Sequence, residues 1–124
     1  MVPYALALDP FAFIVLVSEL AAHTGEMRAD PRVGLLVTEP ESEARPHELA
    51  RVSIQGTAAP LPPGDERFSL AKATYLARFP EVRALFDLGD FRLFTIAPAS
   101  VRVVAGFARA ASIAPALLAQ YLAE

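Results

Sequence analysis

One apolar run, followed at once by a polar corner and a proline, constrains this chain more than any other stretch. Residues Phe11–Val17 are continuously apolar and rich in β-branched and aromatic types, which is typical of a buried strand. Leu20–Arg28 has helical spacing, and this helix must end before Asp30-Pro31, because proline disfavours the helical conformation in the residue preceding it. Val33 then opens a second apolar run. The stretch therefore predicts a strand, a polar corner, one short helix and another strand.

The polar corner, residues Ser18 to Thr24, contains two hydroxyls and an imidazole, those of Ser18, His23 and Thr24. The first turn of a helix presents free N–H groups and a partial positive charge, so a phosphate would be well placed beside these side chains. In the alternative interpretation, Ser18 caps the helix and His23 lies on its surface. On spacing alone the second interpretation is favoured, because serine is a common helix cap.

The composition excludes several classes of protein. The 124 residues are 54% hydrophobic, yet Phe11–Val17 is far shorter than the roughly 18 apolar residues that span a bilayer. This high content of hydrophobic residues favours a well-filled barrel or a buried interface between subunits. No basic region precedes an apolar segment, and the absence of cysteine is compatible with a reducing compartment, so we expect a cytoplasmic protein without a signal peptide. A net charge of -3 without a basic patch argues against nucleic-acid binding.

Alternation and turn signals predict the remaining strands. Ala50–Leu61 alternates most regularly, and Gly56 within it indicates a bulge or a close backbone approach. The continuously apolar strand Val33–Thr38 is expected to be buried on both faces. The other expected strands are Val2–Leu8, which forms a hairpin with Phe11–Val17 through Asp9-Pro10, then Phe91–Ile96 and, after a turn at Ala97–Ser100, Val101–Phe107.

Three further segments are expected to be helical, and one long segment is expected to be a loop. Asp65–Arg78 predicts a helix that Pro80 ends, and Glu81–Leu88 predicts a second short helix ending at Gly89. Ala114–Leu122 predicts a C-terminal helix, whereas Glu39–Glu48 is polar and predicts a surface loop. Together these elements predict a mainly β domain of the α+β class. It would be an antiparallel split β-barrel of about six strands formed by residues 1–124.

Four ordered segments resemble one family, the FMN-binding split barrels related to pyridoxamine 5'-phosphate oxidase. SELAAHTGEMRADPRVGLLV resembles the signature of the branch associated with haem-iron utilisation, and ARPHELARVSIQGTAAPL resembles the family's strand with a G-x-A turn. AKATYLARFPEV resembles its Y-L-x-R-x-P-E helix break, and GDFRLFTIAPASVRVVAGFARA resembles its ending. The resemblance covers nearly the whole chain, and four motifs in order are more specific than one.

The resemblance implies a homodimer with FMN in the cleft between the two subunits. By position, His23 corresponds to a cationic side chain that binds the FMN phosphate in the relatives. Hydroxyls and backbone N–H groups of the polar corner would assist it, and two side chains of the fourth strand would point towards the ribityl chain or the ring. The implied cofactor-binding residues are Ser18, Leu20, His23, Thr24, Arg51, Gln55 and Arg109, of which Arg109 would reach in from the last strand.

The chain departs from the family pattern in two places. Gly25-Glu26 stand where relatives have a basic residue and asparagine, and a carboxylate near a phosphate is repulsive unless it points away. Relatives also begin with a further N-terminal strand, whereas this sequence starts at the strand that follows it.

Three functional classes stay open at this stage. The first is an FMN-dependent oxidoreductase, in which the cofactor performs the redox step. The second is a haem-binding protein of haem-iron utilisation, for which His23 and His47 are the available histidine ligands. The third is a barrel without a ligand that serves as an interaction module. The residues indicate no resident metal site and no general acid or base, and the substrate stays unspecified.

Overall fold

A computed structural model describes residues 2–8, 10–38, 51–104 and 110–122. Its main feature is one antiparallel sheet in the order β1-β2-β5-β4-β3, with β6 paired to the far end of β5. The strands are β1 (Tyr4–Leu8), β2 (Phe11–Ser18), β3 (Arg32–Thr38), β4 (Arg51–Leu61), β5 (Phe91–Val104) and β6 (Ala110–Ile113). This confirms the predicted α+β class, and six antiparallel strands are consistent with the split barrel.

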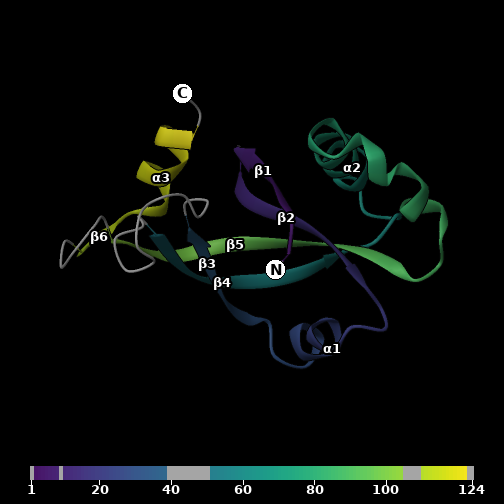
Figure 1. Cartoon of the computed structure of the whole chain (residues 1–124), viewed down its shortest axis with the longest axis horizontal. Helices are drawn as coiled ribbons and strands as arrows, with labels where there is room; N and C mark the ends of the chain where they lie inside the picture. Colours follow the sequence, from purple (N-terminus) through teal and green to yellow (C-terminus); the bar gives the residue numbers. More distant parts are fainter. Residues whose placement is uncertain (1, 9, 39–50, 105–109, 123–124) are drawn as a thin grey trace, which may run out of the picture.

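Within the residues that the structure describes, three α-helices and one 3-10 helix accompany the sheet. They are α1 (Ala22–Ala29), α2 (Phe68–Arg78), the 3-10 helix η2 (Pro80–Asp87) and α3 (Pro115–Leu122). In the view of Figure 1, α1 lies below β4, while α2 and α3 lie above the sheet. None of these described helices has the length and apolar character needed to cross a bilayer.

Strand β2 is buried on both faces, which explains its unbroken apolar sequence. On one face, Phe13 and Val15 pack with Phe94 of β5 in the larger core cluster, where these side chains are at most 3% exposed. On the other face, Ile14 packs in a second cluster with Tyr75 of α2. The helix therefore covers the outside of the β1–β2 hairpin, and burial raises the pKa of the Tyr75 hydroxyl.

Strand β3 corrects one expectation. Its residues alternate between exposed and half-buried, so it is not buried on both faces. The reason is its place at the edge of the sheet, where β4 alone pairs with it among the described strands. Val33, Leu35 and Val37 face the larger cluster, whereas Leu36 on the outer face is 66% exposed.

Strand β5 corrects a second expectation, because the predicted turn at 97–100 is not a turn. The strand runs unbroken from Phe91 to Val104, and its register against β4 shifts where Gln55 pairs with Ser100 and Gly56 with Pro98. Ala99 is the extra residue of a β-bulge, a position at which a strand tolerates the missing N–H of a neighbouring proline.

Gly56 fulfils both of its predicted roles at this bulge. A Cβ atom at residue 56 would lie 2.6 Å from the backbone oxygen of Ala97 on β5. Real Cβ atoms essentially never come so close to a backbone oxygen. Glycine therefore allows β4 and β5 to approach where the register changes.

Candidate functional site

The polar corner joins the end of β2 to α1, and its two hydroxyls hold its backbone together. The Leu20 N–H donates to Ser18 Oγ at 3.1 Å, so the Ser18 side chain closes a local turn. The Thr24 hydroxyl donates to the Ser18 carbonyl at 2.6 Å, and Thr24 is fully buried. The N-cap of α1 is Ala21, which has no side-chain cap, so Ser18 stabilises the turn ahead of the helix.

His23 differs from both hydroxyls because it is exposed. It lies in the first turn of α1, where its imidazole is open to solvent. Glu26, three residues on and one turn along the same helix, is also exposed. The side chain of Leu20, just before the helix, is 86% exposed.

Three charged side chains form a network next to the polar corner. The Arg28 guanidinium donates to both carboxylate oxygens of Glu19, at 2.7 and 2.5 Å, in a bidentate pair. Arg92 of β5 approaches the same carboxylate, with Nε 3.6 Å from Oε1. The hydrogen bonds from Arg28 hold the pKa of the Glu19 carboxyl below its usual range. Two guanidinium groups therefore share one carboxylate, which leaves this network with one positive charge at neutral pH.

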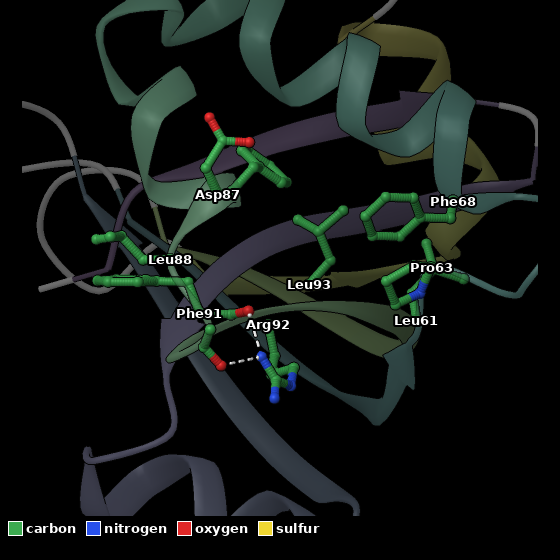
Figure 2. Close-up of a pocket in the computed structure, with 10 residues that line it drawn as sticks. Leu61, Pro63, Phe68, Asp87, Leu88, Phe91, Arg92 and Leu93 are labelled. Carbon is green, nitrogen blue, oxygen red and sulfur yellow. Dashed lines mark hydrogen bonds between the residues drawn. The ribbon is translucent and has the colours of Figure 1, made fainter.

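An apolar pocket of about 350 Å³ opens beside this network (Figure 2). Figure 2 shows the Arg92 guanidinium turned away from Phe68 and Leu93, and its Nη1 donates to the carbonyl oxygens of Gly89 and Phe91. The pocket is lined by Leu61, Pro63, Phe68, Phe86, Asp87, Leu88, Gly89, Phe91, Arg92 and Leu93. Phe91 pairs with Ser18, so the pocket adjoins the polar corner.

The sequence had not predicted this pocket as a site. Its walls come from the end of β4, α2, η2 and the start of β5, which are brought together by the fold. Each of its apolar residues has an ordinary core explanation, although Leu61, Phe91 and Leu93 lie within segments that resemble the family's motifs. Phe91, at the start of β5, is half-buried.

A second, more polar groove of about 500 Å³ lies at the bulge between β4 and β5. Gln55, one of the predicted cofactor-binding residues, lines it together with an exposed ion pair between Asp30 and Arg32. The other lining residues are Val33, Gly34, Gly56, Thr57, Ala99 and Ser100. Arg51 lies four residues before Gln55 on the same strand and is half-buried.

The predicted site residues therefore fall into two groups at opposite ends of α1. Ser18, Leu20, His23 and Thr24 lie at its N-terminal end, whereas Gln55 lines the groove with Asp30 at its C-terminal end. Eight helical residues separate these ends by about 12 Å. Arg109 and His47 lie outside the described residues. Within the described parts of the chain, no three His, Cys, Asp or Glu side chains gather into a group suited to a metal ion.

The sequence is similar to a family profile and to several known proteins. The sequence profile described as Pyridoxamine 5'-phosphate oxidase matches residues 1–105. "Non-canonical heme oxygenase HOZ, chloroplastic" from Arabidopsis thaliana is 34% identical over 98 residues, which are 78% of this chain and 28% of HOZ. "Heme oxygenase HutZ" from Vibrio cholerae is 29% identical over 100 residues, which are 79% of this chain and 57% of HutZ. The chain thus spans between about a quarter and about three fifths of these relatives.

A solved structure has the same fold. A heme binding protein from Mycobacterium smegmatis superimposes with a TM-score of 0.81 at 28% identity, over 96% of this chain and 48% of that one. The profile match covers most of the chain, and these relatives share both its sequence pattern and its fold. The chain belongs to the pyridoxamine 5'-phosphate oxidase family, on the haem-associated branch that includes HutZ and HOZ.

Proposed function

We propose that this protein binds haem and that His23 supplies the iron ligand. The observation that carries the proposal is an exposed imidazole at the polar corner of a fold whose relatives are named for haem. Histidine is a common axial ligand of haem iron. A buried histidine engaged in the core would not suit this role, whereas His23 is open to solvent.

Groups near this end of the sheet match the other chemical needs of haem. The porphyrin ring needs apolar contacts; the exposed Leu20 lies in the polar corner, and the pocket beside Phe91 lies at the same end of the sheet, on the face that α2 covers. Its propionates need cations, and the network of Arg28 and Arg92 around Glu19 carries one positive charge. The residue types present therefore fit the group.

Bound haem would supply the iron chemistry, and the residues of this chain would hold and orient the group. His23 would contribute its ring nitrogen, and the hydrogen bonds that the Leu20 N–H and the Thr24 hydroxyl donate to Ser18 would fix the turn that presents it. Arg28 would keep the network in place because its bidentate pair with Glu19 spans from the corner to the last turn of α1.

Haem titration followed by absorbance tests this proposal. The parent protein should develop a Soret band that saturates at a fixed molar ratio of haem to protein. His23→Ala should shift that band and weaken haem binding. His47→Ala is the matched control and should leave both unchanged. A Soret titration of His23→Ala that superimposes on that of the parent would remove His23 as the ligand.

FMN is the second candidate, favoured by the family profile together with the polar groove at Gln55. In this alternative, His23 holds the single terminal phosphate, so FMN should bind more tightly than riboflavin or FAD. His23→Ala should then cost about 1.5–3 kcal/mol of FMN affinity, the range for hydrogen bonds to charged groups. Flavin bands instead of a Soret band in the purified protein would favour FMN, and calorimetry with equal affinity for riboflavin would exclude a phosphate role for the corner.

We also propose that the working unit is a homodimer with the ligand in the cleft between two copies. The outer face of β3 supports this, because Leu36 is 66% exposed there beside the polar groove. An edge strand can pair with or pack against another chain, and such an assembly would cover the Leu36 side chain.

A further inference from the structure

The pocket beside Phe91 is a gap at the margin of the second core cluster, on the face of the sheet that α2 covers. Leu61 of β4 pairs with Leu93 of β5, and these two side chains, each 2% exposed, form its floor. Its walls are the rings of Phe68 of α2, Phe86 of η2 and Phe91, all of which are half-buried. Protein cores are normally packed without gaps of this size, so a cavity of about 350 Å³ leaves apolar surface that a small molecule would cover.

Hydrogen bonds hold the loop that forms one side of this pocket. Arg92 Nη1 donates to the carbonyl oxygens of Gly89 and Phe91, at 2.6 and 2.9 Å. The backbone N–H of Glu19 donates to the carbonyl oxygen of Asp90 at 2.6 Å, which ties the same loop to the polar corner. This side of the pocket is therefore pre-formed, which lowers the cost of ordering it around a ligand.

The side chains around the pocket offer an acceptor and direct no donor into it. Among the described lining residues, only Asp87 and Arg92 have polar side chains. Figure 2 shows the Arg92 guanidinium turned away from Phe68 and Leu93, towards the loop carbonyls, and its Nε lies 3.6 Å from Glu19. Asp87 is exposed at the end of η2, and none of the hydrogen bonds or ion pairs between described residues involves its carboxylate. A ligand in this pocket therefore meets one free carboxylate.

We propose that this pocket binds a small, flat aromatic molecule with a single N–H or O–H donor, its ring among the three phenylalanines and its donor hydrogen-bonded to Asp87. Aromatic walls favour a flat ring, because stacked and edge-to-face ring pairs attract each other beyond the area that they bury. The carboxylate favours a donor and repels an anionic ligand. The site goes beyond the proposed haem function, because α1 with His23 and α2 lie on opposite sides of the sheet (Figure 1).

Indole is the first probe, because it is a flat ring whose only polar group is an N–H donor. The sequence contains no tryptophan, so the anisotropy of indole fluorescence can be followed without tryptophan emission from the protein. We expect saturable binding of indole. 1-Methylindole lacks the donor and should bind about three- to tenfold more weakly, the factor that one net hydrogen bond supplies. Binding to apolar surface alone would favour the methylated ring, so equal or tighter binding of 1-methylindole, or no saturable binding of indole, would overturn the proposal.

Two pairs of variants test the acceptor and the aromatic wall. Asp87→Ala should lower the affinity for indole to that for 1-methylindole, whereas Glu81→Ala, which removes an exposed carboxylate of η2 outside the pocket, should leave the ratio unchanged. Phe68→Leu should weaken both probes, and Leu70→Ala, on a part of α2 where that leucine is 74% exposed, should weaken neither. An unchanged ratio in Asp87→Ala would refute the proposal, and because Asp87 is exposed, this variant decides the question even if Phe68→Leu fails to fold.

Haem tests whether the pocket is a separate site. Indole binding to the haem-saturated protein is measured by equilibrium dialysis, because haem would quench indole fluorescence. We expect the same affinity as in the haem-free protein. Loss of indole binding would assign the pocket to the haem site and overturn a separate one. If the protein takes up no haem, the proposed function fails, whereas the titrations with indole and 1-methylindole still decide this proposal.

Discussion

Replacing Thr24 by valine separates a structural role of the polar corner from a role in ligand binding. Valine has nearly the same shape, so the change removes the hydroxyl that donates to the Ser18 carbonyl at 2.6 Å and leaves the buried volume filled. A buried carbonyl left without any partner costs about 1–3 kcal/mol. The Ser18 carbonyl, however, also accepts the Ala21 N–H at 3.1 Å, so it keeps one partner.

The expected loss is therefore at the lower end of that range, about 1 kcal/mol. For a domain of this size the entropy of unfolding is about 0.26 kcal/mol/K, so the Tm should fall by about 4 °C. Urea unfolding followed by circular dichroism measures the change, and the slope of the transition should stay the same. Thr24→Ser is the matched control, since it keeps the hydroxyl and removes one methyl group.

Two results would contradict the assignment of the Thr24 hydroxyl to the stability of the fold. If Thr24→Val unfolds at the same urea concentration as the parent but loses haem or FMN affinity, then the hydroxyl serves the ligand and not the fold. If Thr24→Ser is the less stable of the two variants, then packing of the methyl group matters more than the hydrogen bond.

Four other predictions follow from particular contacts. Gly56→Ala should destabilise the protein by about 1–3 kcal/mol because its Cβ would lie 2.6 Å from the Ala97 oxygen, while Gly64→Ala, with nothing within 4 Å, should change the urea midpoint little. Gly25→Ala should raise the free energy of unfolding by about 0.5–1 kcal/mol, because alanine suits a helix better and no atom lies within 4 Å of the new Cβ. The pKa of Asp65 is lowered to about 2, chiefly by side-chain hydrogen bonds from Arg67. The stability that this carboxylate contributes is therefore present above its ordinary pKa of 3.8 and is lost as pH falls towards 2. Between pH 5 and pH 2.5, the urea midpoint should fall less in Asp65→Asn than in the parent. Sedimentation at micromolar concentration should give a dimer, and a monomer there would count against a ligand cleft between subunits.

Much of the fold was predictable because it depends on local patterns. The apolar run of β2, the stop at Asp30-Pro31 and the alternation of β4 each act over a few residues, and all three elements are present. Gly56 was also informative, because glycine inside an alternating strand indicates a close backbone approach. The resemblance to a family added the arrangement of these elements, which local patterns do not specify.

The chemistry of the polar corner was only partly predictable. The sequence identified Ser18, His23 and Thr24 as a group, but the structure assigns the two hydroxyls to backbone turns and leaves the imidazole exposed. A hydroxyl can bind a backbone group or a ligand, and the fold of the corner brings the Thr24 hydroxyl to the Ser18 carbonyl. Whether these residues also bind a cofactor stays a prediction.

What the sequence by itself determined was the set of segments that must be buried, since apolar runs and their periods are properties of the chain. What the tertiary structure decided was which partner each segment meets. Val33–Thr38 has the apolar character of a central strand, yet it lies at an edge because no described strand pairs with its far side. Ala97–Ser100 has the composition of a turn, yet it continues β5 because Gly56 on the neighbouring strand leaves room for a bulge. The β3–β4 partners are 13 to 25 positions apart in the sequence, and the pairs at the bulge are 42 and 45 positions apart, so a local pattern contains no information about these contacts.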